Sequence, residues 1–242
     1  MLAVVALLLL VHGWAVGALS VQPYEAYQAH PTKRAKASRA AFKTAGGIVY
    51  IRDFLTDDEF DEVRGEGRRL RGKAKREKDS IAIGRLGRCV DRRSPTHKLL
   101  TSAAISDRLC ELLGEEYEAS EYPIELRHYP RGAQMEWHRD DLLFSPAQCE
   151  VVLTLENDSD SRTEWFDGLG RKEGVWTEPN SIIAVRAGED GPSHRVTPIQ
   201  RGERTIIKMV FAPCGGTKTA MYEEHLDSFP GRRVRKKVTS RK

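Results

Sequence analysis

Cysteine, internal repeats and long apolar segments are all scarce in this chain of 242 residues. Its four cysteines allow at most two disulfides, and none has the short spacing of a metal site. Cys110 and Cys149 lie within apolar runs, so we expect them to be buried thiols. Only one segment approaches the length of a bilayer span. A cysteine-ligated zinc fold, a repeat array and a protein with several membrane spans are therefore excluded.

The one apolar segment is residues 1–20. Its apolar core of about ten residues is followed by Val16-Gly-Ala18, which is similar to a small-residue cleavage site. We therefore expect a secretory signal peptide and a location in the secretory pathway, in the lumen of the endoplasmic reticulum. The alternative is an uncleaved signal-anchor, because the run from Leu2 to Val21 is just long enough to span a bilayer. Only that alternative predicts a membrane contact.

Residues 21–45 are poor in acidic side chains, because Glu25 is the only acid before Asp53. Basic residues among alanine, serine and threonine are typical of a flexible linker, which we rank first. They are also typical of the second half of a two-part plastid signal.

Positive charge is concentrated at the two ends of the chain. The formal net charge is +4, yet residues 231–242 alone carry seven basic residues and no acid, so the body of the chain is acidic. The body therefore gives no strong indication of nucleic-acid binding. One internal exception is residues 64–93, with twelve basic and four acidic residues. Glycines at 65, 67 and 72 predict an interrupted helix and a mobile loop there, either solvated or closing over an acidic substrate.

The order of expected elements is helices first and a run of strands after, which is an α+β pattern. Apolar periodicity predicts helices at 56–70 and 98–114, and strands at 47–51, 122–129, 149–156, 181–186 and 204–211. We expect a single domain over residues 46–213, followed by a basic tail over 214–242.

Two histidines and one carboxylate stand out within this domain. His138-Arg-Asp140 follows an expected strand, and His194 and Arg204 come later, ten residues apart. On a strand, residues i and i+2 share a face, so His138 and Asp140 can meet one metal. Two imidazoles and a carboxylate with an open opposite face are how non-haem Fe(II) oxygenases hold iron. A guanidinium at the head of the last strand is suited to a dicarboxylate co-substrate.

A second match to the same pattern, His225-Leu-Asp227, has no later histidine. We therefore expect His225 to be a solvated surface residue.

These segments resemble the prolyl 4-hydroxylase-like branch of the Fe(II)/2-oxoglutarate dioxygenases, over roughly residues 46–213. The resemblance implies a double-stranded β-helix (jelly-roll) core with N-terminal helices packed on one sheet. It also implies iron ligands His138, Asp140 and His194, with Arg204 holding the distal carboxylate of 2-oxoglutarate and Tyr129 near that co-substrate. The implied cofactors are Fe(II), 2-oxoglutarate and O2, with ascorbate as a candidate reductant.

The chain departs from this family in two places that bear on the substrate. Collagen-type members usually carry lysine where this chain has Arg204, and a glycine pair before a threonine is replaced by Asp160-Ser-Arg162. We expect hydroxylation of a peptidyl-proline-type or other protein substrate. The alternatives are a dioxygenase for a small molecule or nucleic acid, and a non-catalytic cupin-like binding module.

Overall fold

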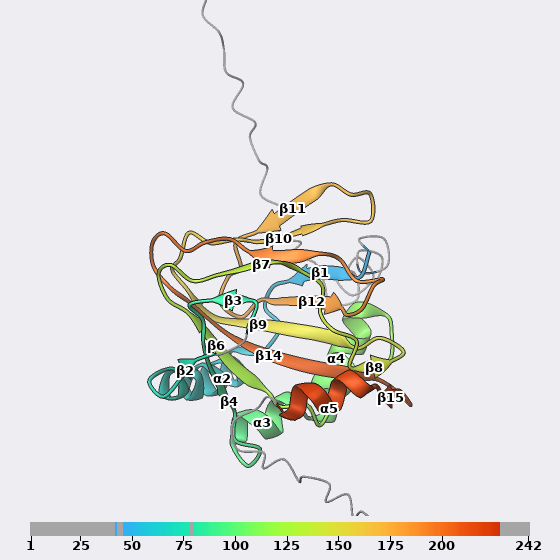
Figure 1. Ribbon diagram of the computed structural model, residues 1–242. Coiled ribbons are helices and arrows are strands. Elements are labelled where there is room, and N and C mark those ends of the chain that lie inside the picture. The colour runs from blue at the N-terminus through green and yellow to red at the C-terminus, as the bar shows by residue number, and fades with distance from the viewer. Residues whose placement is uncertain (1–41, 43–45, 78–79, 228–242) are drawn as a thin grey trace, which may run out of the picture.

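The computed structural model describes residues 42, 46–77 and 80–227 (Figure 1). The expected signal peptide (1–20), nearly all of the basic linker (21–45) and residues 228–242 of the tail lie outside the described residues. Within the described residues, no helix is long and apolar enough to cross a membrane.

The core of the protein is a pair of facing antiparallel sheets. The major sheet has the strand order β1-β12-β9-β14-β6-β4-β2, with β5 pairing to the far end of β14. Figure 1 shows the minor sheet, of order β11-β10-β13-β7-β3, stacked over it. The major-sheet strands are β1 (Ile48–Ile51), β2 (Lys75–Arg76), β4 (Leu86–Cys89), β5 (Tyr117–Ala119), β6 (Glu125–Tyr129), β9 (Cys149–Asn157), β12 (Ile182–Arg186) and β14 (Arg204–Pro213).

The minor sheet is built from shorter strands. They are β3 (Ala82–Ile83), β7 (Gln134–His138), β10 (Thr163–Phe166), β11 (Lys172–Val175) and β13 (His194–Val196), and a separate ribbon pairs β8 (Phe144–Ser145) with β15 (Thr217–Lys218). This arrangement is the expected jelly-roll, or double-stranded β-helix, and the prediction of fold class is confirmed.

Three helices pack on the outer face of the major sheet and bury the main apolar core. They are α2 (Asp57–Arg71), α3 (Pro95–Leu100) and α4 (Ala103–Leu113). Helix α2 begins at a capping box, in which the Thr56 hydroxyl accepts from the Glu59 amide and the Glu59 carboxylate accepts from the Thr56 amide. Leu126, Leu153 and Ile207 belong to the same fully buried cluster. The side chains between them on these strands point to the opposite face, toward the minor sheet.

A fourth helix, α5 (Ala220–Asp227), closes one end of the barrel. Its Tyr222 and Leu226 pack with Tyr122, Phe144 and Val210 in a separate apolar cluster. This apolar cluster fills the space beneath helix α5. The cavity described below lies elsewhere, between the two sheets.

The prediction that Gly65 and Gly67 interrupt the helix within the basic segment 64–93 was wrong, whereas the helix does end at Gly72, and mobility of the rest of this segment stays a prediction. Helix α2 continues through Gly65 and Gly67 to Arg71, and the short strands β2, β3 and β4 follow within the described part of the segment. Gly67 has a packing role: a Cβ at this position would lie 2.3 Å from Leu155 Cδ1 of β9. Glycine therefore lets the helix approach the sheet closely, which offsets its low helix propensity.

The single helix expected over 98–114 is two helices. The first helix ends at Leu100 with Thr101 as its C-cap, and Ser102 caps the second, because its hydroxyl accepts the Ile105 amide. The remaining expected strands lie where they were predicted, within a few residues at each end.

Candidate metal centre and the cavity around it

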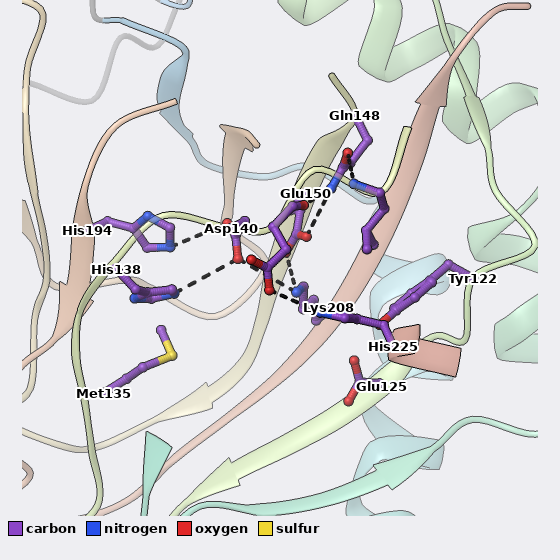
Figure 2. Close-up of polar contacts among 12 residues, drawn as sticks. Tyr122, Glu125, Met135, His138, Asp140, Gln148, Glu150, His194, Lys208 and His225 are labelled. Carbon is purple, nitrogen blue, oxygen red and sulfur yellow. Dashed lines mark hydrogen bonds and ion pairs between the residues drawn. The ribbon is translucent and has the colours of Figure 1, made fainter. Parts of the chain in front are cut away.

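His138, Asp140 and His194 converge on one point between the two sheets (Figure 2). Asp140 Oδ1 lies 3.9 Å from His138 Nε2, and Asp140 Oδ2 lies 3.5 Å from His194 Nε2. One ligand atom from each residue falls within 4.8 Å of the others. Two imidazole nitrogens and one carboxylate oxygen form the donor set that non-haem iron takes on one face.

Strand pairing brings the two histidines together. His138 is the last residue of β7, and it pairs directly with His194, the first residue of β13. The register shifts between His194 and Val196, a bulge of the kind that re-aims side chains next to functional sites.

Asp140 reaches the site by a different route from the predicted one. Strand β7 ends at His138, so strand alternation does not align the two side chains. Instead Asp140 lies two residues beyond the strand end, where its carbonyl accepts a hydrogen bond from the Gly188 amide at 2.9 Å. The His-x-Asp spacing correctly brought His138 and Asp140 together, but the reason given for it, that both lie on one strand, was wrong.

Both histidines have their second ring nitrogen engaged. His138 Nδ1 lies 2.9 Å from the Glu136 carbonyl, and His194 Nδ1 lies 3.1 Å from the Pro192 carbonyl. A carbonyl can only accept, so each Nδ1 carries the proton and each Nε2 presents its lone pair. Burial, and then the neighbouring His194, lower the pKa of His138 to about 4. His138 is therefore neutral at physiological pH, as a metal ligand must be.

Asp140 shares its surroundings with a second carboxylate and an ammonium. Lys208 Nζ lies 3.8 Å from Asp140 Oδ1 and is in direct contact with Glu150 Oε2. Burial raises the pKa of Asp140, but the positive charge of Lys208 outweighs burial and leaves that pKa below its ordinary value. Burial and the neighbouring Asp140 raise the pKa of Glu150 to about 8. Asp140 is thus the ionised carboxylate of the pair.

Arg204 occupies the opposite end of the same cavity. Its side chain is 2 % exposed and donates one hydrogen bond, from Nη1 to Thr163 Oγ1 at 2.9 Å. Its Nε is buried without a hydrogen-bond partner, and no carboxylate of residues 42, 46–77 and 80–227 forms an ion pair with it. Burial lowers the pKa of Arg204 from its usual value. An unbalanced buried guanidinium of this kind is suited to an anionic ligand.

Tyr129 lies beside Arg204, on the neighbouring strand β6 and in direct register with it. Its hydroxyl accepts a hydrogen bond from Arg85 Nη1 at 3.0 Å, and Arg85 is itself held by Glu77. The structure therefore brings together all five side chains singled out in the sequence within one cavity.

The cavity contains about 530 Å³ of empty space, its mouth included. One wall is apolar, and the floor carries additional charged groups that the sequence did not single out. The lining residues are Arg127, Tyr129, Met135, His138, Asp140, Glu150, Val152, Thr163, Ile183, Val185, His194, Val196, Arg204, Ile206 and Lys208.

No sequence motif pointed to four further lining residues, which are Arg127, Glu150, Thr163 and Lys208. A signal for Lys208 was available, because it lies four residues after Arg204 on one strand and so shares its face. Thr163 and Glu150 come from other strands, and their approach depends on pairing registers that a single sequence does not reveal.

His225 is not the solvated surface residue that we expected. Its side chain is about one-third exposed, and its Nε2 lies 3.0 Å from Asp141 Oδ2. It therefore links helix α5 to the residue next to Asp140. All four cysteines are free thiols, with Cys149 buried as predicted and Cys110 partly buried.

No protein-family model and no curated protein matches the chain. Solved structures do match. A prolyl-4-hydroxylase from Pseudomonas putida is 20% identical with a TM-score of 0.56, over 74% of this chain and 98% of that chain. The non-haem α-ketoglutarate-dependent epimerase SnoN of nogalamycin biosynthesis is 14% identical with a TM-score of 0.67, over 83% and 91%.

A prolyl hydroxylase from Trichoplax adhaerens, solved with a peptide fragment of the hypoxia inducible factor, is 13% identical with a TM-score of 0.59, over 75% of this chain and 90% of that chain. At these identities the likeness establishes the fold. The chain has the double-stranded β-helix of the prolyl-4-hydroxylase-like 2-oxoglutarate–Fe(II) oxygenases.

Proposed function

We propose that this protein is an Fe(II)- and 2-oxoglutarate-dependent dioxygenase that hydroxylates a C–H bond and releases succinate and CO2. One observation carries the proposal. A three-atom donor set for a metal and a buried guanidinium with an unpartnered Nε line the same cavity. The first suits Fe(II), and the second suits the distal carboxylate of 2-oxoglutarate.

The residues present fit both groups. His138 and His194 offer Nε2 lone pairs, Asp140 offers an anionic oxygen, and three donors on one side leave the other side of an iron ion accessible. When bound, Fe(II) and 2-oxoglutarate would supply the oxidising chemistry, using O2. The protein supplies position, orientation and the exclusion of water.

Three residues would hold the co-substrate at the end opposite the metal. Arg204 is kept in place by Thr163, and its guanidinium geometry permits two parallel hydrogen bonds to one carboxylate. The Tyr129 hydroxyl accepts from Arg85 and donates only a long contact of 3.9 Å to Met135 Sδ, so its proton can be redirected to the same carboxylate. Between the two ends, Val152, Ile183 and Ile206 provide an apolar wall that limits water.

A peptide or protein is the substrate class that we favour, with peptidyl proline as the first candidate. The family resemblance in the sequence supports it, as does the fold shared with two prolyl hydroxylases, one of them solved with a peptide. A small molecule is the second candidate. The charged cavity floor supports it, and SnoN, which has the same fold, was solved with nogalamycin RO.

The experiment that separates these substrates is an assay of succinate formation with the purified protein, Fe(II), 2-oxoglutarate and a panel of candidates. We expect proline-containing peptides to stimulate succinate release. Each hydroxylated peptide should gain one oxygen atom, or about 16 mass units, for each succinate released. Stimulation by a non-peptide alone would replace the peptide assignment. A protein that binds metal but releases no succinate with any candidate would favour the non-catalytic binding module.

We further propose that residues 1–20 direct the protein to the secretory pathway, with the two-part plastid signal as the alternative. The sequence pattern alone supports this proposal. Amino-terminal sequencing of the protein from cells would test it: cleavage near Ala18 is expected, and an intact Met1 would contradict cleavage.

A further inference from the structure

Five basic side chains lie near one another at one edge of the major sheet without carboxylate partners. They are Arg69, Lys73, Lys75, Arg76 and Arg88, and all five are exposed. None of them forms an ion pair with a carboxylate in the part of the chain that the structure describes. These five residues are called the basic patch below.

The turn after helix α2 and the pairing of β2 with β4 bring these charges together. Arg76 lies opposite Leu86 in that pairing, so Arg76 and Arg88 share one face of the sheet as diagonal neighbours. Arg88 Nη1 also donates to the Lys73 carbonyl at 3.3 Å. Like charges at this spacing repel one another, so the cluster is electrostatically unfavourable in the protein alone.

Most basic side chains elsewhere in the described chain have a carboxylate within reach. Examples are the pairs Arg52–Glu178, Arg171–Asp167 and Arg195–Glu164. The basic patch therefore concentrates positive charge that its own neighbours do not neutralise, and an anionic partner would relieve the repulsion.

The basic patch lies close to the cavity that holds the candidate metal site. Figure 1 shows β2 and β4 beside β6, whose Arg127 lines that cavity. Adjacent strands are about 4.8 Å apart, so β2 is about 10 Å from β6. Lys75 lies opposite Gly87, and Gly87 lies opposite Arg127, so the Lys75 side chain points to the cavity side of the sheet. An extended peptide on β2 would reach the cavity within about three residues, at about 3.3 Å per residue.

Two observations favour an acidic peptide over a nucleic acid as the partner. The segment from Arg69 to Arg88 contains no aromatic residue, so the patch has no platform on which bases could stack. Strand β2 (Lys75–Arg76) is the last strand of the major sheet, and one of its sides has no strand neighbour among the described residues. A free strand edge of this kind can pair with an extended peptide.

We propose that the basic patch is a docking surface for an acidic segment of the protein substrate, a few residues along the chain from the hydroxylated position. The inference rests on the proposed function and deepens it, because it specifies the charge of the substrate beside its target residue. Lys75 and Arg76 contact the segment at the free edge of β2, and the other three residues add to the positive potential.

The test is the fluorescence anisotropy of a labelled peptide, in which a run of glutamates precedes a proline, titrated with the full chain. At about 0.05 M salt, the screening length exceeds about 10 Å and the charges of the patch act together. A peptide with glutamine in place of each glutamate should bind at least about tenfold more weakly, and about 0.3 M salt should remove most of that difference. A single-stranded oligothymidylate with the same number of charges tests the alternative partner.

The variant Lys75→Glu/Arg76→Glu should bind the acidic peptide about tenfold more weakly or worse, because it reverses two exposed charges. Arg171→Glu/Arg201→Glu is the charge-matched control. It changes the net charge equally, at side chains that are 67 % and 86 % exposed in the β10–β11 turn and the β13–β14 loop. Affinity of the control should stay within about twofold of the wild type.

Thermal melts verify that each variant folds. Should the reversed variant not fold, Lys75→Gln/Arg76→Gln takes its place, with an expected loss of about threefold. Equal losses in the patch variant and the control, or equal binding of the two peptides, overturn the inference. Tighter binding of the oligothymidylate than of the acidic peptide, lost in the patch variant, would assign the patch to nucleic acid instead.

Succinate formation by the metal-loaded protein separates this inference from the proposed function. Salt-sensitive binding of the acidic peptide without succinate release from any peptide would support the docking surface and contradict the hydroxylase. Equal stimulation of succinate release by the glutamate and glutamine peptides, at concentrations below saturation, would support the hydroxylase and overturn the docking surface.

Discussion

The two ends of the cavity differ in how their charges are balanced. At the metal end, Lys208 lies between Asp140 and Glu150, and burial keeps His138 neutral by lowering its pKa to about 4. At the other end, Arg204 is buried with one hydrogen bond and no anionic partner. One end is prepared for a cation by ligands with available lone pairs, and the other is prepared for an anion by an uncompensated charge.

This difference indicates how the two ligands depend on the protein. The metal end is held by backbone carbonyls and a charged pair that exist without the metal, so it is preorganised. The Arg204 end carries an electrostatic cost that an anion would remove. Substitutions at the two ends should therefore have separable effects, on metal binding and on 2-oxoglutarate binding.

The largest effect is expected from His138→Ala. Loss of one of three protein ligands should weaken metal binding by more than about a hundredfold, since even changes to residues behind a ligand cost 10–100-fold. Equilibrium dialysis with Fe(II) under anaerobic conditions measures this. His97→Ala is the matched control, because it removes a histidine of helix α3 on the outer face of the major sheet, and it should bind Fe(II) as the wild type does. Equal Fe(II) affinities for the two variants would show that His138 is not a metal ligand.

Arg204→Met should weaken 2-oxoglutarate binding by about fiftyfold while metal affinity stays within about threefold, because a buried charge would lose its partner. Arg204→Lys keeps the charge but loses the bidentate geometry, so its loss should be smaller. Isothermal calorimetry with the metal-loaded protein gives both values. Metal affinity that falls together with 2-oxoglutarate affinity would mean that the two ends are not separable.

The pH dependence of stability should report the neutral state of the metal end. Because the pKa of His138 is lowered to about 4 in the folded protein, the unfolded chain takes up this proton first as pH falls below about 6.5. The metal-free protein should therefore lose about 2 kcal/mol of folding free energy between pH 6.5 and 4 through this residue.

Denaturant unfolding of the wild type and of His138→Gln at several pH values measures that loss. The variant should lack this component of the pH dependence. Parallel curves for the two proteins would show that His138 has an ordinary pKa and that burial does not keep it neutral.

The smallest effect is expected from Thr163→Val at the anion end. The substitution removes the one hydrogen bond that orients Arg204, so 2-oxoglutarate affinity should fall by about threefold. Thr205→Val, on the strand of Arg204 but paired with His128, is the control and should leave this affinity unchanged. A loss in the control equal to that in Thr163→Val would indicate a general disturbance of the sheets.

The sequence predicted most of the fold because long, buried strands carry strong apolar signals. Strands β9, β12 and β14 were all expected from such runs. The minor-sheet strands β10, β11 and β13 were not expected, since they have three or four residues each and mixed polarity. Their existence depends on pairing across the sheet rather than on local preference.

The cavity residues also fall into a group that the sequence predicted and a group that it did not. His138, Asp140, His194 and Arg204 were found through spacing along the chain, and the structure brings them into one cavity. The contact of Lys208 with Glu150 could not be predicted, because it depends on the register between β14 and β9. Gly67 shows the converse: local propensity predicted a break, and close packing against Leu155 favours the glycine within the helix.

The most direct test of the central claim is an anaerobic titration of the purified protein with Fe(II) and then 2-oxoglutarate, followed through the visible charge-transfer band of the chelate. We predict a band in the wild type, no band with His138→Ala, and a band that needs far more 2-oxoglutarate with Arg204→Met. A folded wild type that forms no band at saturating concentrations of both would contradict the claim that the two ends of this cavity hold iron and 2-oxoglutarate.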